Sequence, residues 1–285
     1  MEHPVTLVIF SSEGREHLLK QTYPSFLQHC SYRFAETILA IDGKYDFTAI
    51  GDITPQVIVQ QAGRRGYVTS IQSAINNVKT PYFFWLEDDF IFNRDVPVEY
   101  MLQTMQDDDW AGMCLTRAPL KAEDIVQHYF DDLYVPNFGY SVSPALCNTR
   151  HLKDAIKTLF EVPKDSETRF YGFEPFINDF FVEHNLKYAF INPPDGAFVN
   201  HFGELESTAR EYHMMNSIDE EKTDIDKNYV SGLQKDRNIT IYNKIGMMLK
   251  LWRTAFVLSF KLFTDRRSYD FAFRIYMALL RGFKY

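Results

Sequence analysis

Residues Tyr82–Asp89 have the sequence YFFWLEDD, in which five apolar residues are followed at once by three acidic ones. A continuous apolar run of this length is typical of a buried parallel strand. Ligands of parallel α/β sheets bind at the carboxyl ends of strands. Adjacent carboxylates there repel one another unless solvent or a cation lies between them, and a hard divalent cation prefers oxygen ligands. We therefore expect Glu87, Asp88 and Asp89 to form a metal site, the alternative being a solvated acidic turn.

The same alternation of apolar run and polar loop extends outward along the chain. It predicts strands at Val5–Phe10, Thr37–Ile41 and Gln56–Gln60, and helices at Glu16–His29, Tyr67–Asn77, His151–Phe160 and Gly172–His184. Strands that alternate with helices indicate an α/β fold with a mostly parallel central sheet flanked by helices. The polar clusters after the strands should then meet at one edge of the sheet.

Length and charge suggest one large domain with a basic extension. Residues 240–285 contain nine Lys or Arg and two Asp or Glu, whereas residues 1–239 contain 21 and 36. We expect one domain over 1–239, in which residues 204–239 form a charged loop or lid. Residues 240–285 are expected to form a helical tail, in which Arg267, Arg274 and Arg281 lie on one stripe. Such a tail predicts one of two roles. It binds to an anionic membrane surface, or it packs against the domain or a second subunit.

Composition excludes several classes of protein. With 46% hydrophobic and 16% aromatic residues the chain is not disordered, and a net charge of −8 argues against a nucleic-acid partner. Three cysteines without CxxC spacing indicate neither a disulfide framework nor a zinc site, and favour a reducing compartment. The sequence shows no signal peptide and no apolar run of about 20 residues. We expect a cytoplasmic protein, in one alternative peripheral at the inner face of the membrane.

The order of these segments resembles the GT-A glycosyltransferases, in particular the inverting family 2. The matching segments are VTLVIFSSEGR, TILAIDG, AGRRGYVTSIQSAI and YFFWLEDD, so the resemblance covers residues 4–92 well and continues more weakly to about 203. It implies a GT-A, Rossmann-like fold and an acidic DxD-type motif. It also implies that residues 1–239 are a catalytic domain with a nucleotide-binding half (1–92) and an acceptor half (93–203). It also implies that Mn²⁺ or Mg²⁺ binds the diphosphate of a UDP- or GDP-sugar.

The resemblance also implies roles for individual residues. On the donor side it assigns metal binding to Asp89, Glu87 and a downstream His201, and donor binding to Ser11, Glu13, Arg15, Asp42, Arg64, Arg65 and Asp88. On the acceptor side it places a catalytic base at Glu174, with Asp179 as the rival. Four of these residues have a plainer alternative, which is a turn residue for Asp42, a solvated turn for Arg64 and Arg65, and a structural role for His201.

The function expected from these residues is a metal-dependent glycosyltransferase that acts on an acceptor hydroxyl, with inversion, on a glycan or lipid-linked acceptor. A nucleotidyltransferase is the alternative enzyme, although Ser11–Arg15 has only one Gly and one Arg, whereas that class usually has a longer Gly-rich basic loop. The non-enzymatic alternative is a catalytically inactive GT-A-like module that serves in binding or assembly.

Overall fold

A computed structural model of the chain describes residues 3–50, 53–63, 65–162 and 173–202. These residues form strands β1 to β11, helices α1 to α5 and short 3₁₀ turns η1 and η2. In chain order they are β1 (Val5–Ser12), α1 (Glu16–His29), β2 (Glu36–Asp42), η1 (Phe47–Ile50), β3 (Val57–Gln60), α2 (Tyr67–Asn77), β4 (Tyr82–Glu87), β5 (Phe90–Phe92), α3 (Val98–Thr104), β6 (Trp110–Leu115), η2 (Ala122–Asp124), β7 (Ile125–His128), β8 (Leu133–Pro136), β9 (Ala145–Asn148), α4 (Thr149–Glu161), α5 (Phe173–Glu183), β10 (Lys187–Ile191) and β11 (Val199–His201).

The centre of the described part is a nine-stranded sheet with the order β3-β2-β1-β4-β9-β6-β10-β8-β7. Strands β1, β2, β3 and β4 pair in parallel, and β6 pairs in parallel with β10. Strand β9 is antiparallel to both β4 and β6, and β8 is antiparallel to β10 and β7. Seven of the nine strands therefore run in one direction, which confirms the predicted mixed α/β, mostly parallel architecture.

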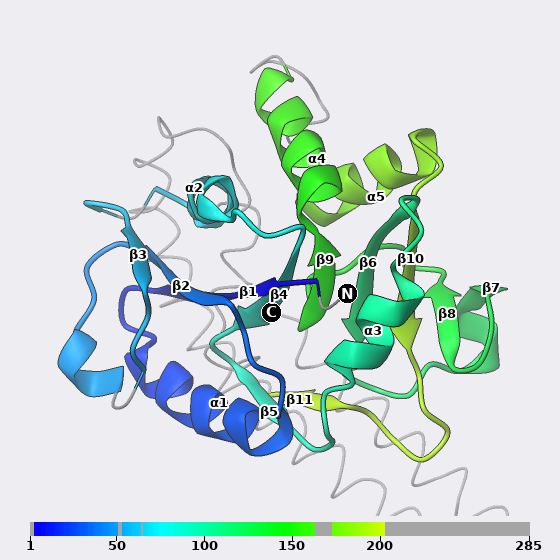
Figure 1. Ribbon diagram of the computed structural model, residues 1–285, viewed down its shortest axis with the longest axis horizontal. Helices are drawn as coiled ribbons and strands as arrows, with labels where there is room; N and C mark the ends of the chain where they lie inside the picture. The colour runs from blue at the N-terminus through cyan, green and yellow to red at the C-terminus, as the bar shows by residue number, and fades with distance from the viewer. Residues whose placement is uncertain (1–2, 51–52, 64, 163–172, 203–285) are drawn as a thin grey trace, which may run out of the picture. The chain divides into compact units, whose positions relative to one another are not determined.

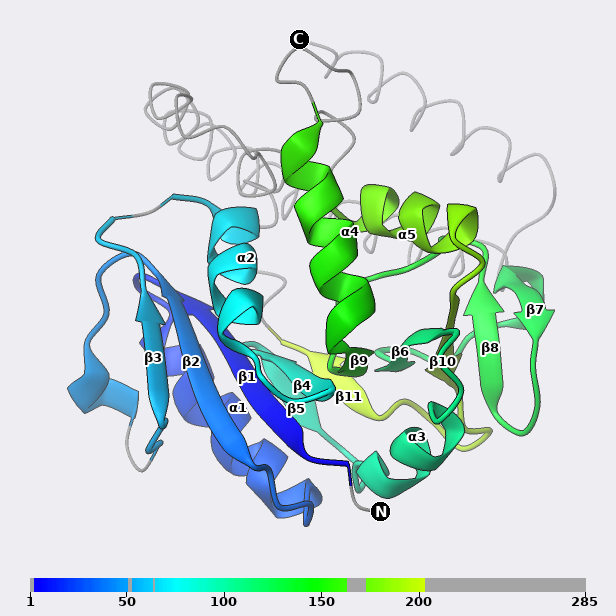
Figure 2. The same cartoon turned by 45° about the horizontal axis from the view of Figure 1, so that its top comes forward.

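Helices cover both faces of the sheet. Figure 2 shows α2, α4 and α5 on one face, with α1 and α3 on the other. Because side chains alternate along a strand, β1 sends Leu7 and Ile9 into the core beneath α1 and α3, and Val8 and Phe10 into the core beneath α2, α4 and α5. Strand β4 is wholly buried from Tyr82 to Leu86, as expected for a strand covered on both faces.

A two-stranded sheet places a distant segment beside the acidic motif. Strand β5 follows Asp89 directly and pairs antiparallel with β11, so that His201 lies opposite Phe90 (Figure 1). The carboxyl ends of β1, β2 and β4 lie at one edge of the parallel sheet, because these neighbours share one direction and register. The chain segments predicted to bind a ligand therefore meet at that edge.

The chain divides into two units, Met1–Lys222 and Thr223–Tyr285, and every described residue belongs to the first. The predicted lid (204–239) and basic tail (240–285) lie outside the described residues. Among the residues that are described, no helix is both long and apolar enough to cross a membrane.

Candidate active site

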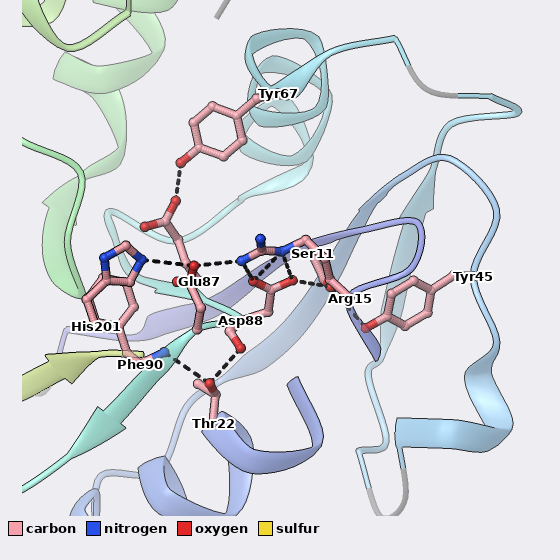
Figure 3. A network of polar contacts seen from close by, with 10 residues as sticks. Ser11, Arg15, Thr22, Tyr45, Tyr67, Glu87, Asp88, Phe90 and His201 are labelled. Atoms are coloured by element: carbon pink, nitrogen blue, oxygen red, sulfur yellow. Dashed lines mark hydrogen bonds and ion pairs between the residues drawn. The ribbon is translucent and has the colours of Figure 1, made fainter. Parts of the chain in front are cut away.

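Arg15 joins the two aspartates that follow β4. Its Nε atom lies 3.0 Å from both carboxylate oxygens of Asp88, and its Nη2 atom donates at 2.6 Å to Asp88 Oδ1 and at 2.6 Å to Asp89 Oδ2 (Figure 3). The Asp88 and Asp89 side chains are only 3% and 7% exposed. Burial of two adjacent carboxylates is costly unless a cation compensates them, and the planar guanidinium suits two carboxylates at once.

The second side-chain partner of Asp89 comes from the far end of the described chain. His201 Nε2 lies 2.9 Å from Asp89 Oδ2, and the His201 ring stacks on Phe90 with centroids 4.9 Å apart. The backbone N–H of Phe202 donates to the Asp89 carbonyl at 3.1 Å. These contacts fix the imidazole beside the carboxylate. The structure thus places His201 beside Asp89, and metal binding by His201 stays a prediction.

Hydroxyl groups from neighbouring elements hold the motif in place. Ser11 Oγ, at the end of β1, donates to Asp88 Oδ2 at 2.5 Å and lies 3.0 Å from the Tyr45 hydroxyl. Thr22, on α1, donates to the Asp88 carbonyl at 2.6 Å and accepts from the Phe90 N–H at 3.1 Å (Figure 3). The backbone turn that carries Asp88 and Asp89 is thereby tied to the helix that follows β1.

Charges in this cluster shift one another's pKa values. Burial alone would raise the pKa of Asp89, but the hydrogen bond from His201 and the charge of Arg15 outweigh burial, and the pKa lies below its ordinary value. Burial would lower the pKa of His201, yet Asp89 raises it above the ordinary value. Burial raises the pKa of Asp88, and Arg15 opposes that rise. Asp89 is thus the member of the cluster that stays ionised most readily.

Glu87 differs from the two aspartates in its hydrogen-bond partner and in its pKa. The Tyr67 hydroxyl, from the first residue of α2, donates to Glu87 Oε1. Burial and the charge of Asp89 raise the pKa of Glu87 to about 8, and the charge of Glu174 contributes to the same rise. Burial and neighbouring negative charge thus favour the protonated form of Glu87, and the charge of a bound cation would lower its pKa.

The predicted donor-binding residues on β2 and its neighbouring loops have mainly backbone partners. Asp42 Oδ1 accepts from the Arg65 N–H at 2.7 Å and Oδ2 from the Gly66 N–H at 3.1 Å, so this carboxylate fixes the start of α2. The exposed Glu13 accepts from the Lys44 N–H at 2.9 Å. The Arg65 side chain is exposed, and Arg64 lies outside the described residues. Nucleotide contacts by these residues stay predictions.

Glu174 lies in the first turn of α5, where its carboxylate is held by the chain that leads to β9. Glu174 Oε1 accepts from the Ser141 hydroxyl at 3.0 Å and from the Val142 N–H at 2.5 Å. Arg117, which follows β6, donates from Nη2 to Ser141 Oγ at 3.0 Å. A cation and a hydroxyl thereby fix the position of this acid at the same edge as Glu87.

Asp179, the rival base, has a different environment. Its side chain is exposed, and its Oδ1 atom lies 3.4 Å from the neighbouring Asn178 Nδ2. The sequence analysis missed Tyr45, Tyr67, Ser141 and Arg117, each of which contacts a predicted site residue. The segment Thr116–Pro119 (TRAP), which follows the apolar run at 110–115, was the available signal for Arg117, since it marks another polar loop at a strand end.

The donor atoms at Asp89 and His201 fit a divalent cation that brings other ligands with it. A carboxylate oxygen and an imidazole nitrogen 2.9 Å apart are atom types that bind Mn²⁺, and Mg²⁺ or Mn²⁺ is commonly held by one or two carboxylates together with substrate phosphates. Among the described residues no group of three or more His, Cys, Asp or Glu is arranged around one point. The described residues thus supply an incomplete set, which a diphosphate could complete.

No protein-family model matches the sequence, and no curated protein does. Many solved structures are similar in fold, among them the three that follow. One is CMP:2-keto-3-deoxy-manno-octonic acid synthetase complexed with CTP, at 15% identity and a TM-score of 0.46, with 66% of this chain and 88% of that chain covered. Another is residues 1–349 of TarS from S. aureus, at 12% identity and a TM-score of 0.46, with coverages of 77% and 67%. TarS in complex with UDP gives 13% identity and a TM-score of 0.45, with coverages of 68% and 59%.

At such TM-scores the structural similarity supports no conclusion about a ligand or a reaction. The architecture rests on this chain's own strand order and pairing, which are those of a mixed α/β fold with a mostly parallel sheet. The expectation of a GT-A fold stays a prediction, and the polar edge of the parallel sheet is the candidate active site.

Proposed function

We propose that this chain is a metal-dependent glycosyltransferase that moves a sugar from a UDP- or GDP-sugar to an acceptor hydroxyl. The observation that supports the proposal is that two different acidic sites lie at the same edge of the sheet. One is the compensated cluster of Asp88, Asp89, Arg15 and His201. The other is Glu174, whose carboxylate is held by Ser141 and Val142 and whose charge contributes to the raised pKa of Glu87.

The cluster suits the leaving group. When the bond between the anomeric carbon and the phosphate oxygen breaks, negative charge develops on the nucleoside diphosphate, and preorganised cations stabilise it. A bound Mn²⁺ or Mg²⁺ would supply Lewis-acid stabilisation of that charge. Asp89 and His201 would hold the cation, while Ser11, Thr22 and Arg15 keep the aspartates in place.

Glu174 suits the acceptor. A sugar or lipid-linked hydroxyl is a weak nucleophile, so a positioned carboxylate must take its proton as the new bond forms. Ser141 and Val142 hold the Glu174 carboxylate, and Arg117 holds Ser141. Attack from the face opposite the leaving diphosphate would invert the configuration of the anomeric carbon.

Glu174→Gln tests the base. The full chain is assayed with a panel of UDP- and GDP-sugars and Mn²⁺, with release of the nucleoside diphosphate as the readout. A general base contributes ~10²–10⁴-fold, so turnover should fall by that factor while UDP or GDP binding is kept. Glu183→Gln, on an exposed position of the same helix, is the matched control and should keep full turnover. Loss of turnover in Asp179→Asn with full turnover in Glu174→Gln would transfer the role to Asp179.

Calorimetry tests the donor side. UDP or GDP should bind at least ~10-fold more tightly with Mn²⁺ than in EDTA, because the protein atoms and the phosphates share the cation. Asp89→Asn should remove most of this difference, whereas Asp154→Asn, at an exposed position on α4, should not. Equal affinities in Mn²⁺ and in EDTA would contradict metal dependence. Pyrophosphate release from a nucleoside triphosphate would indicate a nucleotidyltransferase.

A further inference from the structure

A cavity lies at the opposite edge of the sheet from the candidate active site. It has a volume of about 480 Å³, and its walls come from α3, the turn after α3, the loop after β7, and the strands β6 and β10. Trp110 and Lys187 are the first residues of β6 and β10, so the cavity opens at the amino ends of these strands. In Figure 1, α3, β8 and β7 lie near β6 and β10. The cavity therefore shares no residue with the acidic cluster.

Aromatic rings form one part of its lining. They are Tyr100, Trp110, Tyr129 and Phe130. Trp110 is 3% exposed and lies at the base, with the Tyr129 ring centroid 5.2 Å away. Phe130 is 46% exposed, although it lies one residue from a ring that packs on the core. An exposed phenyl ring beside a cavity offers an apolar surface to a ligand.

Polar side chains form the other part. They are Gln103, Thr104, Asp107 and Lys187. Lys187 Nζ lies 2.6 Å from Asp109 Oδ2 and 5.8 Å from the Trp110 ring centroid, so an acid and a ring already compensate its charge. Asp107 adds a further negative charge. The lining thus combines an amide, a hydroxyl, a carboxylate and an ammonium group, without excess positive charge.

We propose that this cavity binds a saccharide of one or two sugar units. Sugar rings present apolar C–H faces, which pack on aromatic rings, and hydroxyl groups, which hydrogen-bond to amides, carboxylates and ammonium groups. The volume lies in the ~300–1,000 Å³ range of small-molecule sites, in which aromatic walls and a few polar groups share recognition. The acids Asp107 and Asp109 disfavour a phosphate, and the polar half of the lining disfavours a lipid chain. The proposal stands on this cavity and does not require the transferase reaction.

Saturation-transfer NMR on the full-length protein tests the site, with maltose, cellobiose and N,N′-diacetylchitobiose as probes. At least one disaccharide should receive saturation on its ring protons. Phe130→Ala and Gln103→Ala should each weaken binding ~10-fold or more. Val126→Ala is the matched control, because Val126 is 66% exposed on the adjacent β7 and does not line the cavity. Circular dichroism checks that each variant is folded.

The outcomes separate this site from the proposed reaction. Glu174→Gln, which tests the base at the other edge of the sheet, should bind the same disaccharide as the unmodified protein does. No saturation transfer to any of the three probes would overturn the proposal. So would unchanged binding in both cavity variants, or loss of binding in Glu174→Gln, which would place the saccharide at the catalytic edge.

Discussion

Arg15 supplies the positive charge that allows two carboxylates to be buried side by side. The sequence places Asp88 next to Asp89, and each must lose much of its hydration at the end of a fully buried strand. The fold provides one guanidinium that contacts both, itself only 12% exposed at its side chain. Removing one partner of a buried ion pair leaves an uncompensated charge, which costs more than the pair contributes.

Arg15→Met should therefore destabilise the protein by about 3–5 kcal/mol. Urea unfolding followed by tryptophan fluorescence measures the change. Arg33→Met removes an exposed arginine and should change the free energy of unfolding by no more than about 0.5 kcal/mol. Adding Asp88→Asn to Arg15→Met should restore part of the loss, because one buried charge is then removed. If Arg15→Met unfolds at the same urea concentration as Arg33→Met, the cluster does not depend on this cation.

At the scale of elements, the loop between β8 and β9 is fastened to α5. Asn178 Oδ1 accepts from the Tyr140 N–H at 3.1 Å and from the Tyr188 hydroxyl at 2.8 Å. The loop approaches this side chain so closely that a Cβ added to Gly139 would lie 2.6 Å from Asn178 Oδ1. Gly139 also has φ +78°, in the left-handed region that favours glycine. The same loop carries Ser141 and Val142, so its position on α5 also sets the contacts of Glu174.

Gly139→Ala should destabilise the protein more than Gly14→Ala does. Gly14 has φ +82° with nothing within 4 Å of its added Cβ, so both variants share a left-handed backbone cost of roughly 1–2 kcal/mol. Only Gly139→Ala adds a clash with Asn178. The difference between the two melting temperatures therefore measures the fit of loop to helix. Equal losses in the two variants would show that Asn178 moves away at little cost.

At the scale of the whole molecule, the charge is divided between an acidic body and a basic extension. Residues 240–285, which lie outside the described part, carry nine Lys or Arg against two acids. A polybasic segment gains about 1 kcal/mol per basic residue near an anionic bilayer, and salt weakens this attraction. The sequence-based hypothesis of a membrane-binding tail is thus open to a direct test.

Full-length protein should sediment with phosphatidylglycerol vesicles at low salt and be partly released at high salt. A chain ending at residue 239 should stay in the supernatant while it keeps its folded near-ultraviolet spectrum. Phosphatidylcholine vesicles are the neutral control. If the full-length protein does not sediment with anionic vesicles at low salt, the membrane hypothesis is wrong. The expectation that the tail packs against the domain or a second subunit is then favoured.

Local pattern was enough to predict the first half of the fold. Helices Glu16–His29 and Tyr67–Asn77 have the predicted bounds, and the strand before Glu87 is buried as its sequence indicated. These elements follow from short-range hydrophobic periodicity and from polar residues at strand ends. The same pattern placed Ser11, Arg15, Asp88 and Asp89 at one edge, because parallel strands end together.

The sequence by itself thus determined the α/β class, the acidic edge and the residue types available there. Only the tertiary structure decided that Arg15 contacts both aspartates and that His201 reaches Asp89 across 112 positions. It alone joined Arg117 and Ser141 to Glu174, inserted β9 between β4 and β6, and formed the cavity beside Phe130. The physical reason is that these contacts depend on strand pairing and packing between distant segments, which no local periodicity encodes.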